Sequence, residues 1–444
     1  MTTSKRRPKI MRAFSNNADP DRNSRTDASE RSVVYLTNVP FSRRDYDRYG
    51  LPHWLAEGYR VCVLDVGPVI FAQREQSWEY SLYRDETFRL EIAKNTADLR
   101  KLQPLLDGAE LIVDLVTAHG HSRWNLPVLR AVAKSGRPSL VMSVNAYPGY
   151  DLPVDALTGI IARLKHFGKR LAAADPLNSV IARLPFRWFG IHPATAVVYG
   201  GRRSHRAIST VTNDTLVING HHMDFDGFLA SDLESSEGDY AVFIDQGLDG
   251  HREFVENRAF RQIDIGAYYH QLRNLFARVE AKFGLDVVIA KHPHGLSDSL
   301  ERHLPGRRIV SGETAKLIAG SSLVIVHNSA AMTIAVLRRK PLLVVFSKDY
   351  IEASPWNPVC HYPLLDALHR RCLYLEELNT YTDDELFADL TSGFQDYIND
   401  YVTLEPQRKE KLWPLISRVL RENQLIGAPP SLSATSNIRT LEAR

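Results

Sequence analysis

Residues 323–345 read LVIVHNSAAMTIAVLRRKPLLVV, and this stretch decides the fold. It begins with a short apolar run at 323–327, continues with a helix-sized segment at 330–339 and ends in a second apolar run at 342–346. Short buried strands joined by a helix-length segment are typical of a parallel sheet with crossover helices. The stretch therefore predicts an α/β protein.

The same alternation extends in both directions along the chain. Further strand-like runs of the second half lie at 240–244, 286–291, 308–310 and 372–375. The first half carries its own series, at 33–37, 60–66, 111–117, 139–144, 195–199 and 215–218. The polar run SDLESSEGD at 231–239 separates the two series and is typical of a linker. We expect two tandem doubly wound, Rossmann-like domains that face each other across a cleft.

Composition excludes several classes of protein. The 444 residues are 44% hydrophobic and 24% charged with a net charge of +3, which is ordinary for a globular chain and gives no basis for nucleic-acid binding. Three cysteines without a CxxC pair fit a reducing, cytoplasmic compartment. The segments at 1–31, with eight basic and four acidic residues, and at 426–444 are predicted to be disordered tails.

Polar clusters follow three strands of the second series directly. They are Asp245 with Asp249, then Lys291 with His292 and Pro293, and finally Asn328 with Ser329 and Ala330. In a parallel sheet all three open on the carboxyl edge, where ligands of such folds bind. A carboxylate there can act as general base, a histidine can neutralise a phosphate, and a serine at a helix start can bind one.

Each cluster also has a plain structural interpretation. The aspartate can close a turn before Gly247, and the serine can cap a helix with no ligand present. His292 can be an ordinary hydrogen-bonded histidine. The convergence of the three clusters is therefore a stronger argument than any one of them.

The motifs carry a resemblance to a known group. The stretch KHPH at 291–294, followed by 309–345, resembles bacterial GT-B glycosyltransferases and capsule polysaccharide synthesis proteins. The stretch FIDQGLDG at 243–250 looks like the acidic motif of bacterial sialyltransferases and Kdo transferases, which use CMP-sugars. The resemblance covers 240–346 and reaches the first half by architecture and by a general similarity at 33–66. It implies that Asp245 or Asp249 is the base, that His292 contacts the donor phosphate and that Ser329 binds it.

The resemblance implies an inverting glycosyltransferase without metal or cofactor that builds a surface polysaccharide, capsule or lipopolysaccharide. It implies an acceptor domain at 32–230, a nucleotide-sugar domain at 240–403 and a terminal helix at 404–425 that packs back on the acceptor domain. The helix after Ser329 lacks an acid to hold a ribose, which favours a CMP-linked donor over a UDP-linked one. The alternatives are a UDP-sugar transferase, an enzyme like UDP-GlcNAc 2-epimerase, and a non-catalytic protein that binds glycan or nucleotide.

Two features of the first half bear on the acceptor. Polar residues after its strands are candidates for the acceptor side: His119, His121, Asn145, His222 and Asp224. The segment 157–189 alternates apolar, aromatic and basic residues, a pattern that either covers a core or docks on an anionic membrane. We therefore expect a lipid-linked or glycan acceptor, and a location in the cytoplasm at the inner face of the inner membrane.

Overall fold

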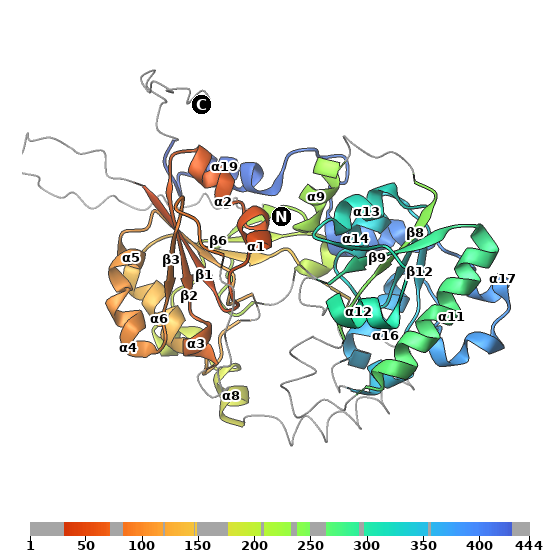
Figure 1. Cartoon of the computed structure of the whole chain (residues 1–444). Helices are drawn as coiled ribbons and strands as arrows, with labels where there is room; N and C mark the ends of the chain where they lie inside the picture. The colour runs from red at the N-terminus through yellow and green to blue at the C-terminus, as the bar shows by residue number, and fades with distance from the viewer. Residues whose placement is uncertain are drawn as a thin grey trace, which may run out of the picture.

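The computed structural model describes residues 31–71, 83–118, 120–145, 147–148, 176–205, 208–231, 238–248, 263–292, 297–353 and 357–428. Most of the predicted tails at 1–31 and 426–444, and most of the linker predicted at 231–239, lie outside these residues. The described chain forms two lobes, each built around one sheet (Figure 1).

The first sheet has seven parallel strands in the order β3-β2-β1-β4-β5-β6-β7. They are β1 (Ser32–Thr37), β2 (Arg60–Asp65), β3 (Arg89–Ile92), β4 (Leu111–Asp114), β5 (Ser139–Ser143), β6 (Ala196–Tyr199) and β7 (Leu216–Asn219). The helical elements around them are α1 (Arg43–Arg48), α2 (Leu51–Ala56), α3 (Gly67–Ile70), α4 (Thr96–Lys101), α5 (Gln103–Asp107), α6 (Leu126–Ser135), α8 (Pro176–Ile181), η1 (Phe186–Phe189) and η2 (Arg202–Ser204).

Helices cover both faces of this sheet. Successive side chains of a strand point to opposite faces, so each strand contributes to two cores. Val33 and Tyr35 of β1 face a core formed with α1, α2 and the terminal helix α19 (Leu412–Glu422). Val34 and Leu36 face a second core formed with α3 to α6. This two-sided burial explains why the strands read as continuous apolar runs.

The second sheet has five parallel strands in the order β10-β9-β8-β11-β12. They are β8 (Tyr240–Ile244), β9 (Asp286–Lys291), β10 (Ile309–Ser311), β11 (Leu323–Val326) and β12 (Leu342–Val344). The helical elements around them are α11 (Ile265–Phe283), α12 (Ser297–His303), α13 (Thr314–Gly320), α14 (Met332–Leu337), α15 (Lys348–Ala353), α16 (Asn357–Ala367), η3 (Leu375–Thr380), α17 (Asp383–Leu386), α18 (Phe394–Tyr397) and η4 (Ile398–Val402).

Two segments join the lobes. Helix α9 (Asp224–Ser231) leaves the first sheet and packs on α13 and α14, with Phe225 inside the second core. After η4 the chain returns and α19 lies on the first lobe, where Trp413 contacts Tyr35 and Trp54. Both crossings lie at the upper end of the two lobes in the view (Figure 1).

The predicted fold class, two doubly wound α/β domains, is confirmed. Three local elements differ from the prediction. Strand β3 was not predicted, because its sequence RLEI is too polar to form an apolar run. The predicted strand at 372–375 is only an isolated bridge between Phe346 and Tyr374. The predicted helix at 330–339 is shorter, since α14 begins at Met332 and ends at Leu337.

Candidate functional site

The three polar clusters lie at the ends of three neighbouring strands. The order β9-β8-β11 places Lys291 and His292 beside Asp245, and Asp245 beside the turn that contains Ser329. Because all three strands are parallel, their carboxyl ends share one edge of the second sheet. Asp249 and Pro293 lie outside the described residues.

Asp245 connects two of these strand ends directly. Its side chain is only 2% exposed, and its Oδ2 accepts the backbone N–H of His292 at 3.1 Å. Its own N–H donates to the carbonyl of Ala290 at 3.0 Å. A carboxylate held in this way fixes the end of β9 relative to β8 and thereby positions Lys291 and His292, both of which are half-buried.

The segment after β11 is a turn rather than the first turn of a helix. Ser329 Oγ accepts the N–H of Ala331 at 3.3 Å, and the Ser329 carbonyl accepts the N–H of Met332 at 3.1 Å. Asn328, Ser329 and Ala330 are all half-buried. The serine therefore sits just before α14 and organises the turn that leads into it.

His327, which the sequence analysis did not select, is a buried element of the same edge. Its Nδ1 donates to the carbonyl of Val345, and its Nε2 accepts the hydroxyl of Tyr268 at 2.8 Å. Burial lowers the pKa of His327 from 6.5 to about 4, so the ring is neutral near pH 7. It joins β11, α11 and the chain after β12, and its role is structural.

A pocket of about 320 Å³ adjoins this edge between the starts of α11 and α15. Four carboxylates line it, from Asp264, Asp349, Glu352 and Glu376, and Glu376 accepts the hydroxyl of Ser347 at 2.8 Å. Lys348, the one basic residue among the described residues of the lining, forms an ion pair with Glu377. The run SKDYIE, which directly follows a predicted strand, is the sequence signal for it.

Two acceptor-side candidates of the first lobe differ in their surroundings, while His119 lies outside the described residues. His121 is buried, and both ring nitrogens are engaged, Nδ1 with Ser209 Oγ at 2.6 Å and Nε2 with the Ile181 carbonyl at 2.8 Å. That pattern is the ordinary hydrogen-bonded histidine. Asn145 is exposed, and its Oδ1 accepts the N–H of Met223 at 3.4 Å.

The last two candidates, His222 and Asp224, lie in the connection between the lobes. His222 Nδ1 accepts the N–H of Asp224 at 3.1 Å, and burial lowers the pKa of His222 from 6.5 to about 4. Asp224 forms ion pairs with Arg48 at 3.4 Å and Arg44 at 3.9 Å. The structure does not bring this pair together with the edge residues of β8 and β9 by any described contact.

The described ranges contain neither a metal-binding cluster nor a membrane-spanning helix. No group of three or more histidine, cysteine, aspartate or glutamate side chains there is arranged to hold a metal ion. No helix within those ranges has the length and apolar character needed to cross a bilayer.

Comparisons with solved structures identify the fold. A histidine-to-asparagine variant of the wall teichoic acid polymerase TagF has a TM-score of 0.50 at 10% identity, over 89% of this chain and 90% of that one. MurG of Acinetobacter baumannii has a TM-score of 0.43 at 11% identity, over 83% and 94% of the two chains. UDP-GlcNAc 2-epimerase of Methanocaldococcus jannaschii has a TM-score of 0.45 at 10% identity, over 88% and 99%.

At these identities the likeness defines the fold alone, which is the GT-B arrangement of two Rossmann-like domains. No protein-family model matches the chain, and no curated protein matches it.

Proposed function

We propose that this chain is a glycosyltransferase that moves a sugar from a nucleotide donor to a surface-glycan or lipid-linked acceptor. One observation carries the proposal. Three polar strand ends meet on neighbouring parallel strands, and the Asp245 carboxylate binds the His292 backbone across two of them at 3.1 Å. This is the edge where α/β domains bind nucleotides.

Each residue then has a chemical role. His292, held by Asp245, neutralises or protonates the departing phosphate, with Lys291 adding positive charge and Ser329 donating a hydroxyl. Since Asp245 is buried, Asp249, four residues further along the chain, is the better candidate for the base. The base removes the acceptor hydroxyl proton, the oxygen bonds to the anomeric carbon, and the bond to phosphate breaks. A single displacement of this kind inverts the anomeric carbon.

The donor is proposed to be CMP-linked. Helix α14 reads MTIAVL and carries no acid that could hold the ribose of a UDP-sugar. A CMP-sugar carries one phosphate, which suits Lys291 and His292, the basic side chains among the described residues of these strand ends.

The test is a thermal-shift assay with CMP, UDP, GDP and ADP. A nucleotide at one hundred times its Kd stabilises the folded state by about 2.7 kcal/mol. We expect CMP to raise the Tm of the wild type, and we expect His292→Ala to reduce that shift. The matched control is His369→Ala, which removes an exposed histidine paired with Asp396 at 3.5 Å.

The possible results separate the alternatives. A shift with UDP alone contradicts the CMP donor and favours a UDP-sugar transferase or an epimerase-like enzyme. A CMP shift that His292→Ala leaves unchanged removes His292 from the site. Absence of any nucleotide shift overturns the proposal and leaves a protein that binds glycan without a donor.

A membrane contact is proposed for the segment that contains α8 and η1. Leu177, Val180 and Trp188 are 56%, 53% and 73% exposed, while Arg183 and Arg187 lie exposed among them. Residues 176–189 contain no acid. The opposite side of the segment packs on α6, through the apolar residues Ile181, Phe186 and Phe189. Exposed tryptophan beside arginine is suited to the interface of an anionic bilayer.

Cosedimentation with vesicles tests this contact. We expect the protein to pellet with phosphatidylglycerol vesicles and to remain in solution with phosphatidylcholine vesicles. Trp188→Ser should weaken the first interaction about tenfold, through loss of buried apolar area. Val217→Ser changes an exposed valine of β7 and serves as the control. Equal binding by both variants and the wild type would contradict the proposal.

A further inference from the structure

The strand order of the first sheet indicates where a ligand of the first lobe binds. β1 has β2 on one side and β4 on the other, so the strand order changes direction between β1 and β4. In doubly wound sheets, ligands bind outside the carboxyl ends of the strands at such a point. The β4–α6 connection, described at 115–118 and 120–125, begins at the carboxyl end of β4 and therefore borders this position.

Hydrogen bonds fix the shape of the β4–α6 connection. Asp114 Oδ1 accepts the N–H groups of Val116 at 2.8 Å and Thr117 at 2.9 Å. The Thr117 carbonyl accepts the N–H of Gly120 at 2.7 Å, and Asn125 Nδ2 donates to the Gly120 carbonyl at 3.0 Å. The connection is therefore held against the end of β4 and against the start of α6.

His121 joins this connection to α8. Its Nε2 donates to the Ile181 carbonyl at 2.8 Å, because a carbonyl oxygen can only accept. In the neutral ring Nδ1 then accepts the Ser209 hydroxyl at 2.6 Å, while Ser209 Oγ accepts the backbone N–H of His121 at 3.0 Å. His121 is 4% exposed and uses both ring nitrogens within the protein. It is placed to position other groups and not to contact a substrate.

Two further hydrogen bonds hold the segment of α8 and η1. The Arg123 N–H of the β4–α6 connection donates to Asn178 Oδ1 of α8 at 2.8 Å. Arg130 Nε of α6 donates to the Phe189 carbonyl, at the end of η1, at 2.7 Å. The segment 176–189 is thus bound to the connection and to α6 at its beginning, its middle and its end.

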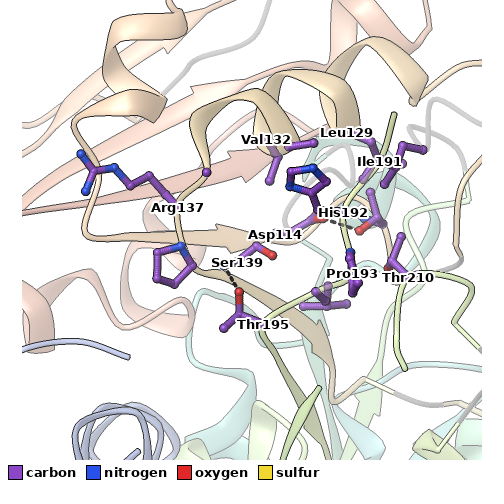
Figure 2. A pocket seen from close by; sticks show the side chains of 16 residues that line it. Asp114, Leu129, Val132, Arg137, Ser139, Ile191, His192, Pro193, Thr195 and Thr210 are labelled. Carbon is purple, nitrogen blue, oxygen red and sulfur yellow. Dashed lines mark hydrogen bonds between the residues drawn. The ribbon is translucent and has the colours of Figure 1, made fainter. Parts of the chain in front are cut away.

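Apolar packing supports the same attachment. The inner side of α8 and η1 packs on a small core that contains Leu129 and Ile191. Figure 2 shows Leu129 of α6 beside Ile191, at one side of a pocket of about 320 Å³ whose lining also includes Thr210. Thr210 directly follows Ser209, so the partner of His121 belongs to a loop that packs beside this core.

The outer side of the same segment is the surface proposed to contact the membrane. It carries exposed apolar and basic side chains, which are Leu177, Val180, Arg183, Arg187 and Trp188. One short segment therefore joins the proposed bilayer contact, on its outer side, to the ligand-binding edge of the first lobe, on its inner side.

We propose that His121 is a positioning residue that couples membrane docking to the ligand-binding edge of the first lobe. Docking on an anionic bilayer restricts the segment 176–189, and the hydrogen bonds of His121 and Arg123 transmit this restriction to the β4–α6 connection. The acceptor-side edge is then held at the bilayer surface, where a lipid-linked acceptor lies. This coupling rests on the proposed function through its membrane contact, and it is independent of the donor.

Hydrogen–deuterium exchange of the full chain, with and without phosphatidylglycerol vesicles, tests the proposal. The amides of His121 and Arg123 report on the coupling directly, because they donate to Ser209 and Asn178. We expect these vesicles to slow exchange about fivefold in peptides that cover 176–189 and in peptides that cover 120–125, the effect of about one hydrogen bond on a local opening equilibrium. Phosphatidylcholine vesicles should slow neither.

Variants of His121 and its partner separate coupling from docking. His121→Leu removes both ring hydrogen bonds, so it should keep the slowing at 176–189 and lose the slowing at 120–125. His121→Gln retains a donor for the Ile181 carbonyl and should restore part of the slowing at 120–125. Ser209→Ala is milder, removes only the partner of Nδ1 and should reduce the slowing at 120–125.

The matched control is His53→Leu. It removes the hydrogen bond between His53 Nε2 and Ser417 Oγ at 2.8 Å, on the opposite face of the first sheet. This variant should keep the slowing in both regions, and circular dichroism verifies that all variants fold. A loss of coupling through general destabilisation would appear in His53→Leu as well.

The outcomes distinguish the coupling from the function on which it rests. Absence of slowing at 176–189 in the wild type overturns the membrane contact and the coupling together. Slowing at 176–189 without slowing at 120–125, or equal slowing at 120–125 in the wild type and His121→Leu, overturns the coupling alone. The thermal-shift assay with CMP examines the donor separately.

Discussion

At the scale of single residues, burial decides which polar side chains are available for chemistry. Asp245 and His327 directly follow strands, and His222 lies three residues beyond the end of β7, yet all three are buried and hydrogen-bonded. A side chain at a strand end can hold neighbouring elements together through hydrogen bonds, or it can face a ligand and take part in catalysis. Only the three-dimensional contacts separate His327, which joins β11 to α11, from His292, which remains half-buried at the edge.

The buried histidines predict a loss of stability in acid. The pKa of His327 is about 4 in the folded state and near 6.5 when unfolded, so the unfolded chain binds more protons between these values. The stabilisation is present above pH 6.5 and is lost as the pH falls toward 4, by up to about 3 kcal/mol. Urea unfolding between pH 7 and pH 4 measures it.

The variant His327→Asn should show a weaker dependence of the unfolding free energy on pH than the wild type. It should also be less stable than the wild type at pH 7, because it loses the hydrogen bond to Tyr268. It retains the contribution of His222, whose pKa is also about 4. His369→Asn, at an exposed site, should keep the wild-type slope. Identical slopes for all three proteins would show that His327 is not held neutral by burial.

At the scale of elements, α19 connects distant parts of the chain. Trp413 packs against Tyr35 and Trp54, with ring centroids 5.7 and 6.4 Å away, and its Nε1 donates to the Arg48 carbonyl at 3.0 Å. Gly50 adopts a φ of +67°, and a Cβ there would overlap the Trp413 ring. The α1–α2 corner is thus shaped to receive this side chain.

Trp413→Ala should destabilise the protein by about 3–5 kcal/mol, the usual cost of truncating a buried tryptophan. Chemical denaturation followed by circular dichroism measures the change. Arg418→Ala on the solvent side of the same helix should cost less than about 1 kcal/mol, because its pairs with Glu410 and Glu422 are exposed. Similar losses for both variants would mean that α19 contributes through charge and not through packing.

The sequence predicts elements best where the physical signal is local. The buried parallel strands are found because two-sided burial requires continuous apolar runs, and the strand-end clusters follow from chain order and parallel topology. Strand β3 escapes because its residues are charged and half-exposed. The role of His327 escapes because its partners Tyr268 and Val345 are 59 and 18 residues away. The pocket around Thr210 likewise joins segments that no local pattern connects.

At the scale of the whole molecule, the two lobes meet where η2 approaches η4. Asp400 pairs with Arg202 at 2.7 Å and with Arg203 at 3.6 Å. The His222 N–H donates to the Val402 carbonyl at 2.8 Å, which adds a backbone link at the same place. The ion pairs are partly exposed and contribute little, so close backbone packing must fix the arrangement of the lobes.

Gly201 tests that conclusion, because its φ of −76° suits any residue and only space requires glycine. A Cβ at this position would lie 2.5 Å from the backbone of Asp400 and Tyr401, so the lobes must separate to admit it. We expect Gly201→Ala to cost about 1–3 kcal/mol and to raise the radius of gyration in small-angle scattering. Gly266→Ala adds a Cβ whose nearest neighbour, Asp264 Oδ1, lies 3.4 Å away, and it should leave the radius of gyration unchanged. If the two variants scatter alike and match the wild type, the contact between η2 and η4 does not hold the lobes together, and α9 with the α19 segment must do so.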